Sequence, residues 1–473
     1  MTVGQHQSDN SYYSNLFAEL AALLQNNASL AHLAFDDANS SISDFISDFR
    51  YNVSPWPVVI DERIIRCFSR VVESMPSVFS KVLRYYYQHD PQWVCQYLGI
   101  SELMLQRFGS QGPDTADLMC RYDAIMAGQQ LKLVELNVGS SLGGWWSDWL
   151  YPEIRQVLDH IGEVKHWNHK YRRISENTFK AVWQSIWRLK GFAAQGNVFI
   201  YLPATATANL QRVHDHLYQM VMLTRPEQYP NATLTIFNDL DNIEWLADGN
   251  IAWQGTVMDT LLLPIVKGDE LPISFQAKLQ GYSEKNKFYY PDSERLTLLS
   301  VKMLFALLHE PRSRQILSDA EWQLVEDHIP WSAKLAQPTV SYHGQIYPTK
   351  TFVSDQQQQL VFKKSRSMQG KDVLVGHSVP AADWIAFYQQ HQQDPDWLIQ
   401  QYCAPDLVAS ADQRSGFNSY RMVWGIFGFD NRYAGAWCRG VPAAHEDTVI
   451  NLARGAVEFV VTEQQPQKLK MTL

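Results

Sequence analysis

Apolar residues in the first quarter of the chain recur at intervals of three and four. The clearest examples are SNLFAELAALL (14–24) and RIIRCFSRVVESMPSVFSKVLRYYY (63–87). This spacing places the apolar side chains on one face of a helix. We therefore expect a helical N-terminal region, with prolines between its helices.

The repeat changes to two residues from about Asp117. LMCRYDAIMA (118–127) and LKLVELN (131–137) are separated by a GQQ turn, a pattern typical of a β-hairpin. The second strand leads into VGSSLGG (138–144), which is polar and rich in glycine. Helices are expected after this loop, near 150–190.

Strands and helices then alternate. NVFIYLP (197–203), ATLTIFN (232–238) and TLLLPIV (260–266) are apolar runs of strand length, and a helix is expected over about 205–223. Such alternation indicates a small parallel sheet with helices on its faces. A helical segment at about 293–330 completes this middle part.

The last third of the chain returns to strands. TVSYHGQIYP (339–348) and QLVFKKSRSMQGKDVLVG (359–376) have the pattern of hairpins. WLIQQYC (397–403) is expected to be a strand that follows a helix at 381–391. The tail, from SYRMVWGIFGF onward, alternates between strands and turns.

Composition and charge narrow the class of protein. The 473 residues are 46% hydrophobic and 19% charged, which is typical of a globular protein. The formal net charge of −9 argues against nucleic-acid binding through bulk charge. The five cysteines are widely spaced without a CxxC pair, which excludes a zinc ribbon and favours a reducing cytoplasm. With no apolar signal sequence and no 18-residue apolar run, no membrane association is expected.

Asp123, Glu135 and Asn137 form the most specific chemical signal. Glu135 and Asn137 are two apart on one strand, so their side chains share a face, and Asp123 comes from the other strand of the hairpin. Oxygen ligands that converge in this way can bind Mg²⁺ together with substrate phosphates. From the spacing alone, a solvent-facing acidic strand end without a ligand explains the pattern equally well.

Three later segments carry weaker signals. The turn in FKKSRSMQGKD (362–372) can place backbone N–H groups and a lysine over a polyphosphate, or be merely solvated. The strand end at Gln400–Tyr402 can offer backbone groups to an adenine edge, or be a buried strand only. Arg421 and Arg439 can bind a carboxylate or phosphate through two parallel hydrogen bonds, or form ion pairs at a sheet edge.

In this order along the chain, the segments resemble the ATP-grasp ligases, in the permuted arrangement of eukaryotic-type glutathione synthetases and bacterial glutathionylspermidine-synthase-like proteins. RYD (121–123) and VELNVGSSLGG (134–144) come early, whereas FKKSRSMQGKDVLVG, LIQQYCAP and MVWGIFGF come late. Most ATP-grasp enzymes have the reverse order. The tail AWCRG…INLARGAVEF resembles the arginine- and alanine-rich loop of the family, and the similarity runs in collinear patches from about 117 to 460.

The resemblance implies roles for individual residues and the use of ATP and Mg²⁺. It implies that the metal on the ATP phosphates is held by Asp123, Glu135 and Asn137. It implies that the nucleotide contacts Lys302 (unless this is an exposed helix lysine), Lys363, Ser365, Ser367, Gly370, Gln400, Gln401 and Tyr402. Substrates would contact Ser140, Ser141, Gly143, Gly144, Arg421, Arg439 and Asn451, with Arg439 holding the carboxylate and Ser141 beside the reacting groups.

Two departures from the family pattern bear on the product. The loop that would cover the phosphates has one glycine, Gly370, where glutathione synthetases have several beside a metal-binding glutamate; Ser367 or Met368 stands near that place. Gln400 and Gln401 stand where an acidic residue is common. Both departures question glutathione as the product, and they leave room for a weak or lost ATPase.

The sequence therefore predicts an α/β protein with an ATP-grasp fold, a small Rossmann-like substrate domain and a helical N-terminal region. The expected function is cytoplasmic, ATP-dependent ligation of a small-molecule carboxylate to an amine through an acyl phosphate, releasing ADP and phosphate. The alternatives are a nucleotide-binding regulatory protein of this fold without turnover, and a ligase with a carrier-protein or peptide acceptor. A homodimer is the candidate assembly. The expected division is a helical region (1–115), a sheet part with the metal ligands (116–194), a Rossmann-like domain (195–290), a helical connection (291–339), a lid (340–405) and a returning sheet part (406–473).

Overall fold

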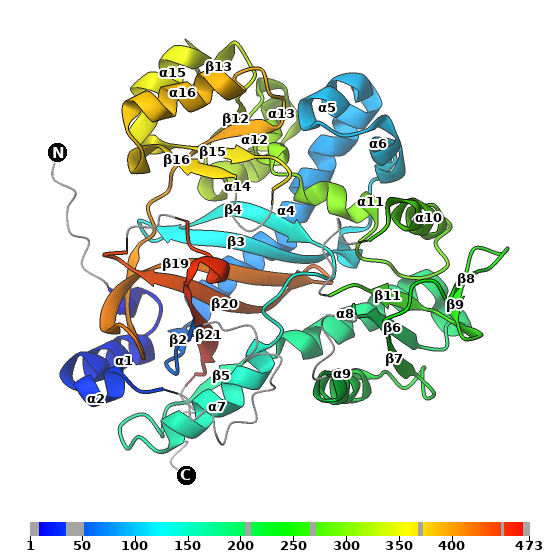
Figure 1. Ribbon diagram of the computed structural model, residues 1–473, viewed down its shortest axis with the longest axis horizontal. Coiled ribbons are helices and arrows are strands. Elements are labelled where there is room, and N and C mark those ends of the chain that lie inside the picture. Colours follow the sequence, from blue (N-terminus) through cyan, green and yellow to red (C-terminus); the bar gives the residue numbers. More distant parts are fainter. Residues whose placement is uncertain are drawn as a thin grey trace.

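Helices and strands are mixed along the chain, and the strands form several sheets (Figure 1). The computed structural model describes residues 9–34, 52–203, 210–264, 271–367, 372–445 and 449–466. Within these ranges the α-helices are α1 Asn15–Asn26, α2 Ala28–Ala31, α4 Glu62–His89, α5 Pro91–Leu98, α6 Glu102–Phe108, α7 Ser147–Asp159, α8 Ile174–Lys190, α9 Leu210–Thr224, α10 Ile273–Ser283, α11 Glu294–Thr297, α12 Met303–Leu308, α13 Pro311–Ile316, α14 Asp319–His328, α15 Thr349–Asp355 and α16 Ala381–His391.

The strands are short at the chain's beginning and longest near its end. They are β1 Asn52–Val53, β2 Val58–Ile60, β3 Met119–Ala127, β4 Gln130–Val138, β5 His169–Tyr171, β6 Asn197–Tyr201, β7 Thr233–Phe237, β8 Ile243–Trp245, β9 Ile251–Trp253, β10 Thr256–Val257, β11 Thr260–Leu262, β12 Ser332–Lys334, β13 Thr339–Tyr342, β14 Gln345–Pro348, β15 Leu360–Lys364, β16 Val373–Val375, β17 Trp397–Gln401, β18 Leu407–Asp412, β19 Gly416–Phe429, β20 Arg432–Pro442 and β21 Val457–Gln464.

The largest sheet joins the early and late parts of the chain. Its strand order is β1-β21-β20-β19-β3-β4, with β18 beside β19 and with β2 and β5 beside β21. The late strand β21 runs parallel to β1 and β2 and antiparallel to β20 and β5. The hairpin β3–β4 therefore extends a sheet whose centre is built from residues beyond 407.

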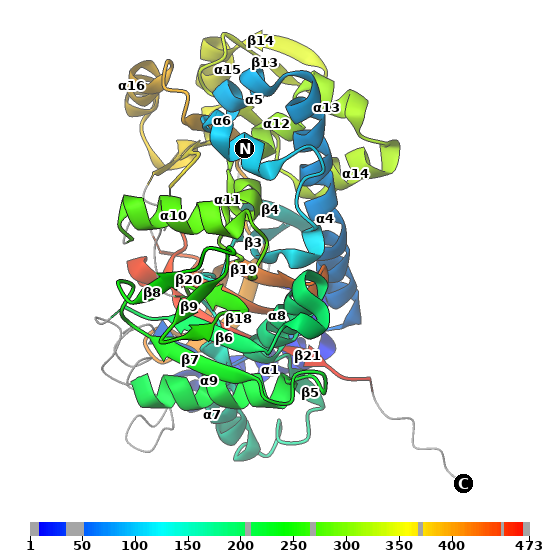
Figure 2. The same ribbon diagram turned by 90° about the vertical axis from the view of Figure 1, so that its right-hand side faces the viewer.

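The long helix α4 covers one face of this sheet (Figure 2). Its N-terminus is capped by Asp61, whose carboxylate accepts hydrogen bonds from the backbone N–H groups of Arg63 and Ile64. Buried apolar residues recur along it at intervals of three and four, from Ile64 to Tyr86. That face contacts β19, β20 and β21, so the opposite face of the sheet is left for the site.

Two smaller units flank the large sheet in Figure 1. The strands β11, β6 and β7 form the parallel sheet expected from the alternating pattern, and α9 lies between β6 and β7 in sequence. The antiparallel strands β12, β17, β15 and β16 form the other unit, whose apolar core includes Phe362 and Trp384 from β15 and α16. The rings of these two residues stack with centroids 3.8 Å apart.

Several elements differ from the sequence prediction. The N-terminal region is mostly helical but contains β1 and β2, and β5 follows α7. The ADGN turn belongs to an additional antiparallel sheet of β8, β9 and β10, and helix α15 follows β14. These strands have only two or three residues, too few for a periodicity to be detected. Among the described residues, we find no helix whose length and apolar character would let it span a bilayer.

Candidate active site

A cavity of about 420 Å³ lies between the free face of the large sheet and the sheet formed by β12, β17, β15 and β16. Many of the residues singled out from the sequence line it. These are Asp123, Glu135, Asn137, Ser141, Gly143, Lys302, Lys363, Ser367, Gln400, Gln401, Tyr402, Arg439 and Asn451. The structure thus brings together residues that are up to 328 positions apart, from Asp123 to Asn451.

The floor of the cavity consists of cross-strand neighbours. Glu135 on β4 lies opposite Asp123 on β3, which lies opposite Gly425 on β19, which lies opposite Trp437 on β20. Side chains of directly opposite residues point to the same face of a sheet. Residues two positions away on the same strands, such as Asn137 and Arg439, share that face.

A β-bulge turns the end of β4 toward the cavity. Asp123 pairs with Glu135 but the next residue, Ala124, pairs with Leu133, so Val134 is an extra residue on β4. Leu131 and Leu133 are buried, and a regular strand would send Glu135 to their face. The extra residue reverses this parity and directs Glu135 and Asn137 to the cavity instead.

Asp123 is held by two arginines rather than left free for a metal ion. Arg121 Nε and Nη2 lie 2.7 and 3.2 Å from its two carboxylate oxygens, and Arg439 Nη2 lies 2.7 Å from Oδ2. Burial acts to raise the pKa of Asp123, but the two guanidinium groups outweigh it and lower the pKa to about 2. Both oxygens of Asp123 are therefore engaged with cations in this structure, and its role as a metal ligand stays a prediction.

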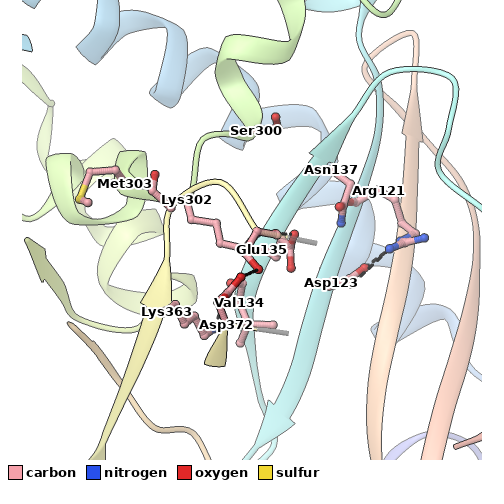
Figure 3. Close-up of polar contacts among 12 residues, drawn as sticks. Arg121, Asp123, Val134, Glu135, Asn137, Ser300, Lys302, Met303, Lys363 and Asp372 are labelled. Atoms are coloured by element: carbon pink, nitrogen blue, oxygen red, sulfur yellow. Dashed lines mark hydrogen bonds and ion pairs between the residues drawn. The ribbon is translucent and has the colours of Figure 1, made fainter. Parts of the chain in front are cut away.

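Lys302 and Glu135 form an ion pair across the cavity (Figure 3). Lys302 Nζ lies 2.9 Å from Glu135 Oε1 and also donates to the backbone oxygen of Ser367 at 2.5 Å. Lys302 is buried, so the alternative of an exposed helix lysine is wrong. Its position immediately before α12 directs the ammonium group to both the sheet and the β15–β16 hairpin.

Lys363 enters the same region from β15. Its ammonium group donates to the Gln400 side-chain oxygen at 2.6 Å and to the Val134 carbonyl at 3.3 Å. Burial lowers the pKa of Lys363 to about 8, although the nearby Glu135 acts in the opposite direction. Gln400 also donates to Ser332 Oγ at 3.1 Å, so the orientation of the amide that accepts from Lys363 is fixed.

Trp437 provides an aromatic surface beside the two arginines. The guanidinium carbons of Arg121 and Arg439 lie 5.6 and 5.2 Å from its ring centroid. Its indole packs directly on Gly425, where a Cβ would lie 2.0 Å from Trp437 Nε1. Trp437 Nε1 and Arg439 Nε are both buried and have no hydrogen-bond partner among the described residues.

Glu458 is a buried carboxylate on the same face of the sheet as Arg439. It lies opposite Arg439 in the sheet and accepts hydrogen bonds from Trp146 Nε1 at 2.8 Å and Ser147 Oγ at 3.3 Å. Burial raises the pKa of Glu458 to about 7, because these neutral donors compensate only part of the lost hydration. Glu458 thereby fixes the ring of Trp146, which lines the cavity.

Some predicted residues do not reach the cavity. Ser140 donates to Asp292 at 2.6 Å, Ser365 Oγ accepts from the Met303 N–H, and Arg421 donates to the His445 carbonyl. Gly144 packs its Cα against Phe427 and Trp437. These residues support the walls rather than line the cavity, and Gly370 lies outside the described residues.

The strand end at Gln401 and Tyr402 also differs from expectation. Both residues line the cavity, but their backbone N–H groups donate to the carbonyls of Trp331 and Gln359. These two N–H groups are thus not free for an adenine edge. Tyr402 instead offers its side chain, whose ring contacts His377 at 4.4 Å between centroids.

Sequence reasoning missed several cavity residues. Arg121 had a signal, since it precedes Asp123 by two residues and must share its face. Asp372, which accepts a hydrogen bond from Ser367 at 2.7 Å, is the first described residue after position 367. No sequence signal pointed to Trp145, Trp146 or Trp437, because tryptophans are usually core residues.

The donor set fits a Mg²⁺ ion shared with a nucleotide, and Glu135 and Asn137 are the members of that set that no arginine side chain binds. Glu135 and Asn137 line the cavity, where Glu135 Oε1 is paired with Lys302 and Asn137 Nδ2 donates to the Arg121 carbonyl. Within the same ranges, no three His, Cys, Asp or Glu side chains are placed to hold a metal ion by themselves. Mg²⁺ commonly binds through one or two side chains and completes its shell with phosphates and water.

Comparison with known proteins supports the fold. The structure matches a glutathione synthetase-like effector from Globodera pallida, in its apo form, over 97% of this chain and 98% of that one, with a TM-score of 0.57 and 11% sequence identity. A putative gamma-glutamylcysteine synthetase from Methylobacillus flagellatus aligns over 84% and 87% of the two chains, but its TM-score of 0.31, at 10% identity, is too low to carry an argument. No protein-family model and no curated protein sequence matches the chain. The chain therefore has a glutathione synthetase-like fold, and its activity has to be argued from the site.

Proposed function

We propose that this protein is an ATP-grasp ligase that joins a carboxylate to an amine, consuming ATP and releasing ADP and phosphate. One observation carries the proposal. A single cavity holds Lys302, Lys363 and Glu135 at one end and Arg439 with Trp437 at the other, and between them Asn137 lies opposite Arg121. This arrangement provides separate positions for a polyphosphate and for a carboxylate.

The lysine end suits the outer phosphates of ATP. Lys302 and Lys363 come from different elements and flank Glu135, so together they can neutralise a triphosphate from two sides. Mg²⁺ bound by Glu135 and Asn137 would neutralise further charge on the same phosphates. The apolar side chains of Val361 and Val375, near Tyr402, line the part of the cavity that would hold the adenine.

The arginine end suits the substrate carboxylate. Asp123 keeps Arg121 and Arg439 side by side, and Trp437 supports both. Arg439 also lines the cavity, and its Nε has no hydrogen-bond partner among the described residues. Asp123 is thus proposed as a positioning residue, which fixes the arginines without touching the substrate itself.

The proposed reaction has two steps. A carboxylate oxygen attacks the γ-phosphorus of ATP, the bond to the β,γ-bridging oxygen breaks, and ADP leaves an acyl phosphate. The amine then attacks the acyl carbon, loses a proton and displaces phosphate. The protein supplies orientation and charge stabilisation rather than a nucleophile.

Heavy-oxygen labelling tests this proposal. Carboxylates labelled with ¹⁸O are incubated with the protein, MgATP and hydroxylamine as a general amine, and ADP, phosphate and hydroxamate are measured. We expect ADP, and we expect one labelled oxygen in each released phosphate. AMP and pyrophosphate as products would contradict the mechanism.

A nucleotide-binding regulatory protein is the second candidate. It is favoured by the engagement of Asp123 with arginines, which leaves Glu135, itself paired with Lys302, as the one carboxylate in the proposed metal set that no arginine binds. MgATP would then raise the melting temperature without ADP release for any carboxylate and amine supplied. A carrier-protein or peptide acceptor would instead give ADP release only when that acceptor is present.

A further inference from the structure

A second, smaller cavity of about 60 Å³ lies behind the glycine-rich loop at 139–146. It is situated where the large sheet meets α8, α9 and the parallel sheet of β6, β7 and β11. Phe179, Leu217, Leu262 and Phe427 are among its walls. Clefts at such junctions between units are frequent positions for small-molecule binding.

This cavity shares a wall with the larger one. Leu142, Gly143, Trp145 and Pro264 line both. Arg121 Nη1 donates to the Leu142 carbonyl, and a Cβ on Gly143 would lie 3.6 Å from the same nitrogen. The guanidinium group proposed to hold the substrate carboxylate is therefore adjacent to the wall that separates the two cavities.

The chemistry of the small cavity is apolar. Its described lining contains no charged side chain, and its polar side chains are the hydroxyls of Ser140, Ser175 and Thr178. Ser140 Oγ is already bonded to Asp292 and to the Leu263 N–H, and Thr178 donates to the Ile174 carbonyl. A charged or strongly polar group would lose its hydration there without compensation.

We infer that the carboxylate substrate carries a small apolar side chain on the carbon next to its carboxylate, and that this side chain occupies the small cavity. The inference rests on the proposed function. With Arg121 and Arg439 on the carboxylate, the neighbouring carbon lies close to the shared wall at Gly143, where the Trp146 ring is 3.1 Å from the position of a Cβ. A volume of about 60 Å³ accommodates about two or three carbon atoms.

Matched ligands test the inference by binding alone. N-acetylglycine, N-acetylvaline and N-acetylaspartate share the same carboxylate and amide, and the last two have side chains of similar size but different polarity. Their affinities for the wild-type protein with MgADP are measured by calorimetry. We expect N-acetylvaline to bind at least tenfold more tightly than either of the others.

Variants of two α9 residues that line the small cavity test whether the substrate's side chain binds there. Val213 lines the small cavity but not the larger one, so Val213→Phe fills only the small cavity. This variant should lower the preference for N-acetylvaline over N-acetylglycine at least tenfold. Leu217→Ala enlarges the cavity and should shift the preference to N-acetyl-leucine. Melting temperatures establish that each variant is folded, and the enlarging variant remains informative if the filling variant is not.

The outcomes separate this inference from the function on which it rests. Equal affinity for the three ligands, or a preference for N-acetylaspartate, overturns the apolar assignment even if ADP release is observed. An unchanged preference in both folded variants overturns the location. Failure of the ligase proposal is seen separately, as the absence of ADP release with every carboxylate.

Discussion

Asp123 and Arg439 are separated by 316 residues in sequence, yet their side chains are 2.7 Å apart in the folded protein. Arg121, two residues before Asp123, binds the same carboxylate from the other side. One acidic residue thus sets the spacing of two arginines. The carboxylate end of the cavity depends on this contact between an early and a late strand.

Removing the Asp123 charge should separate substrate binding from nucleotide binding. In Asp123→Asn the two guanidinium groups lose their shared partner, and we expect kcat/KM for the carboxylate to fall on the order of 100-fold. Stability should fall by about 3 kcal/mol, because two buried cations are left next to each other. MgATP binding, measured by thermal shift, should be retained. Loss of MgATP binding together with activity would instead return Asp123 to the metal site.

Glu135→Gln and Asn137→Ala should abolish MgATP binding, which Asp123→Asn should retain. Each removes an oxygen ligand at the strand end, where few packing contacts are lost, so the melting temperature should change little. Turnover should be abolished and MgATP should no longer raise the melting temperature. Wild-type ADP release in either variant would remove the two-ligand assignment.

Replacing Lys302 should weaken nucleotide binding. Lys302→Met deletes both the ion pair with Glu135 and the bond to the Ser367 carbonyl, and we expect MgATP affinity to fall at least tenfold. Calorimetry measures this change. Lys180→Met is a matched control, since Lys180 pairs with Glu176 on the exposed face of α8. An equal effect in both variants would argue against a direct contact with phosphate.

Glu458 should make stability depend on pH. Its pKa is raised by burial from 4.5 to about 7, so the folded state binds the proton more tightly than the unfolded state. This contribution is therefore fully present below pH 4.5 and is lost as the pH rises to about 7, by up to about 3 kcal/mol. Relative to Glu458→Gln, the unfolding free energy of the wild type should decline over that interval. Parallel urea-denaturation profiles between pH 4.5 and 8 would contradict the assignment.

Gly425 should be required for the position of Trp437. A Cβ at this residue would lie 2.0 Å from Trp437 Nε1, so Gly425→Ala must displace the indole. We expect a loss of about 1–3 kcal/mol in stability and a changed tryptophan fluorescence. Gly281→Ala in α10 is the control, because no atom lies within 4 Å of its Cβ position and the substitution favours the helix.

The hairpin at the centre of the site was predictable because its signals are local. Strand alternation and a two-residue turn fix the pairing, and Gly128 and Gln129 adopt the positive φ angles, 59° and 62°, that such a turn requires. The sequence even contains the bulge: Leu131 and Leu133 are followed by Leu136, so the apolar repeat slips by one residue. That slip is the physical reason that Glu135 and Asn137 face the cavity.

The partners of those residues were not predictable from spacing. An ion pair such as Asp123 with Arg439 depends on which strands become neighbours, and a one-residue change of register would reverse every side chain on a strand. The partners of buried hydroxyl groups were equally unpredictable from the sequence. Ser140 and Ser365 lie in loops expected to contact ligands, but their hydroxyl groups are engaged with Asp292 and with the backbone at Met303.

The position of β21 has a consequence for synthesis of the protein. This strand is the neighbour of β1, β2, β5 and β20, yet it follows all of them in the sequence and leaves the ribosome after them. Until then the growing chain has to carry an incomplete sheet whose edges are open to other chains. Because contacts of such long range form slowly, translation of β21 sets the earliest moment at which Arg439 and Asp123 can meet within the completed sheet.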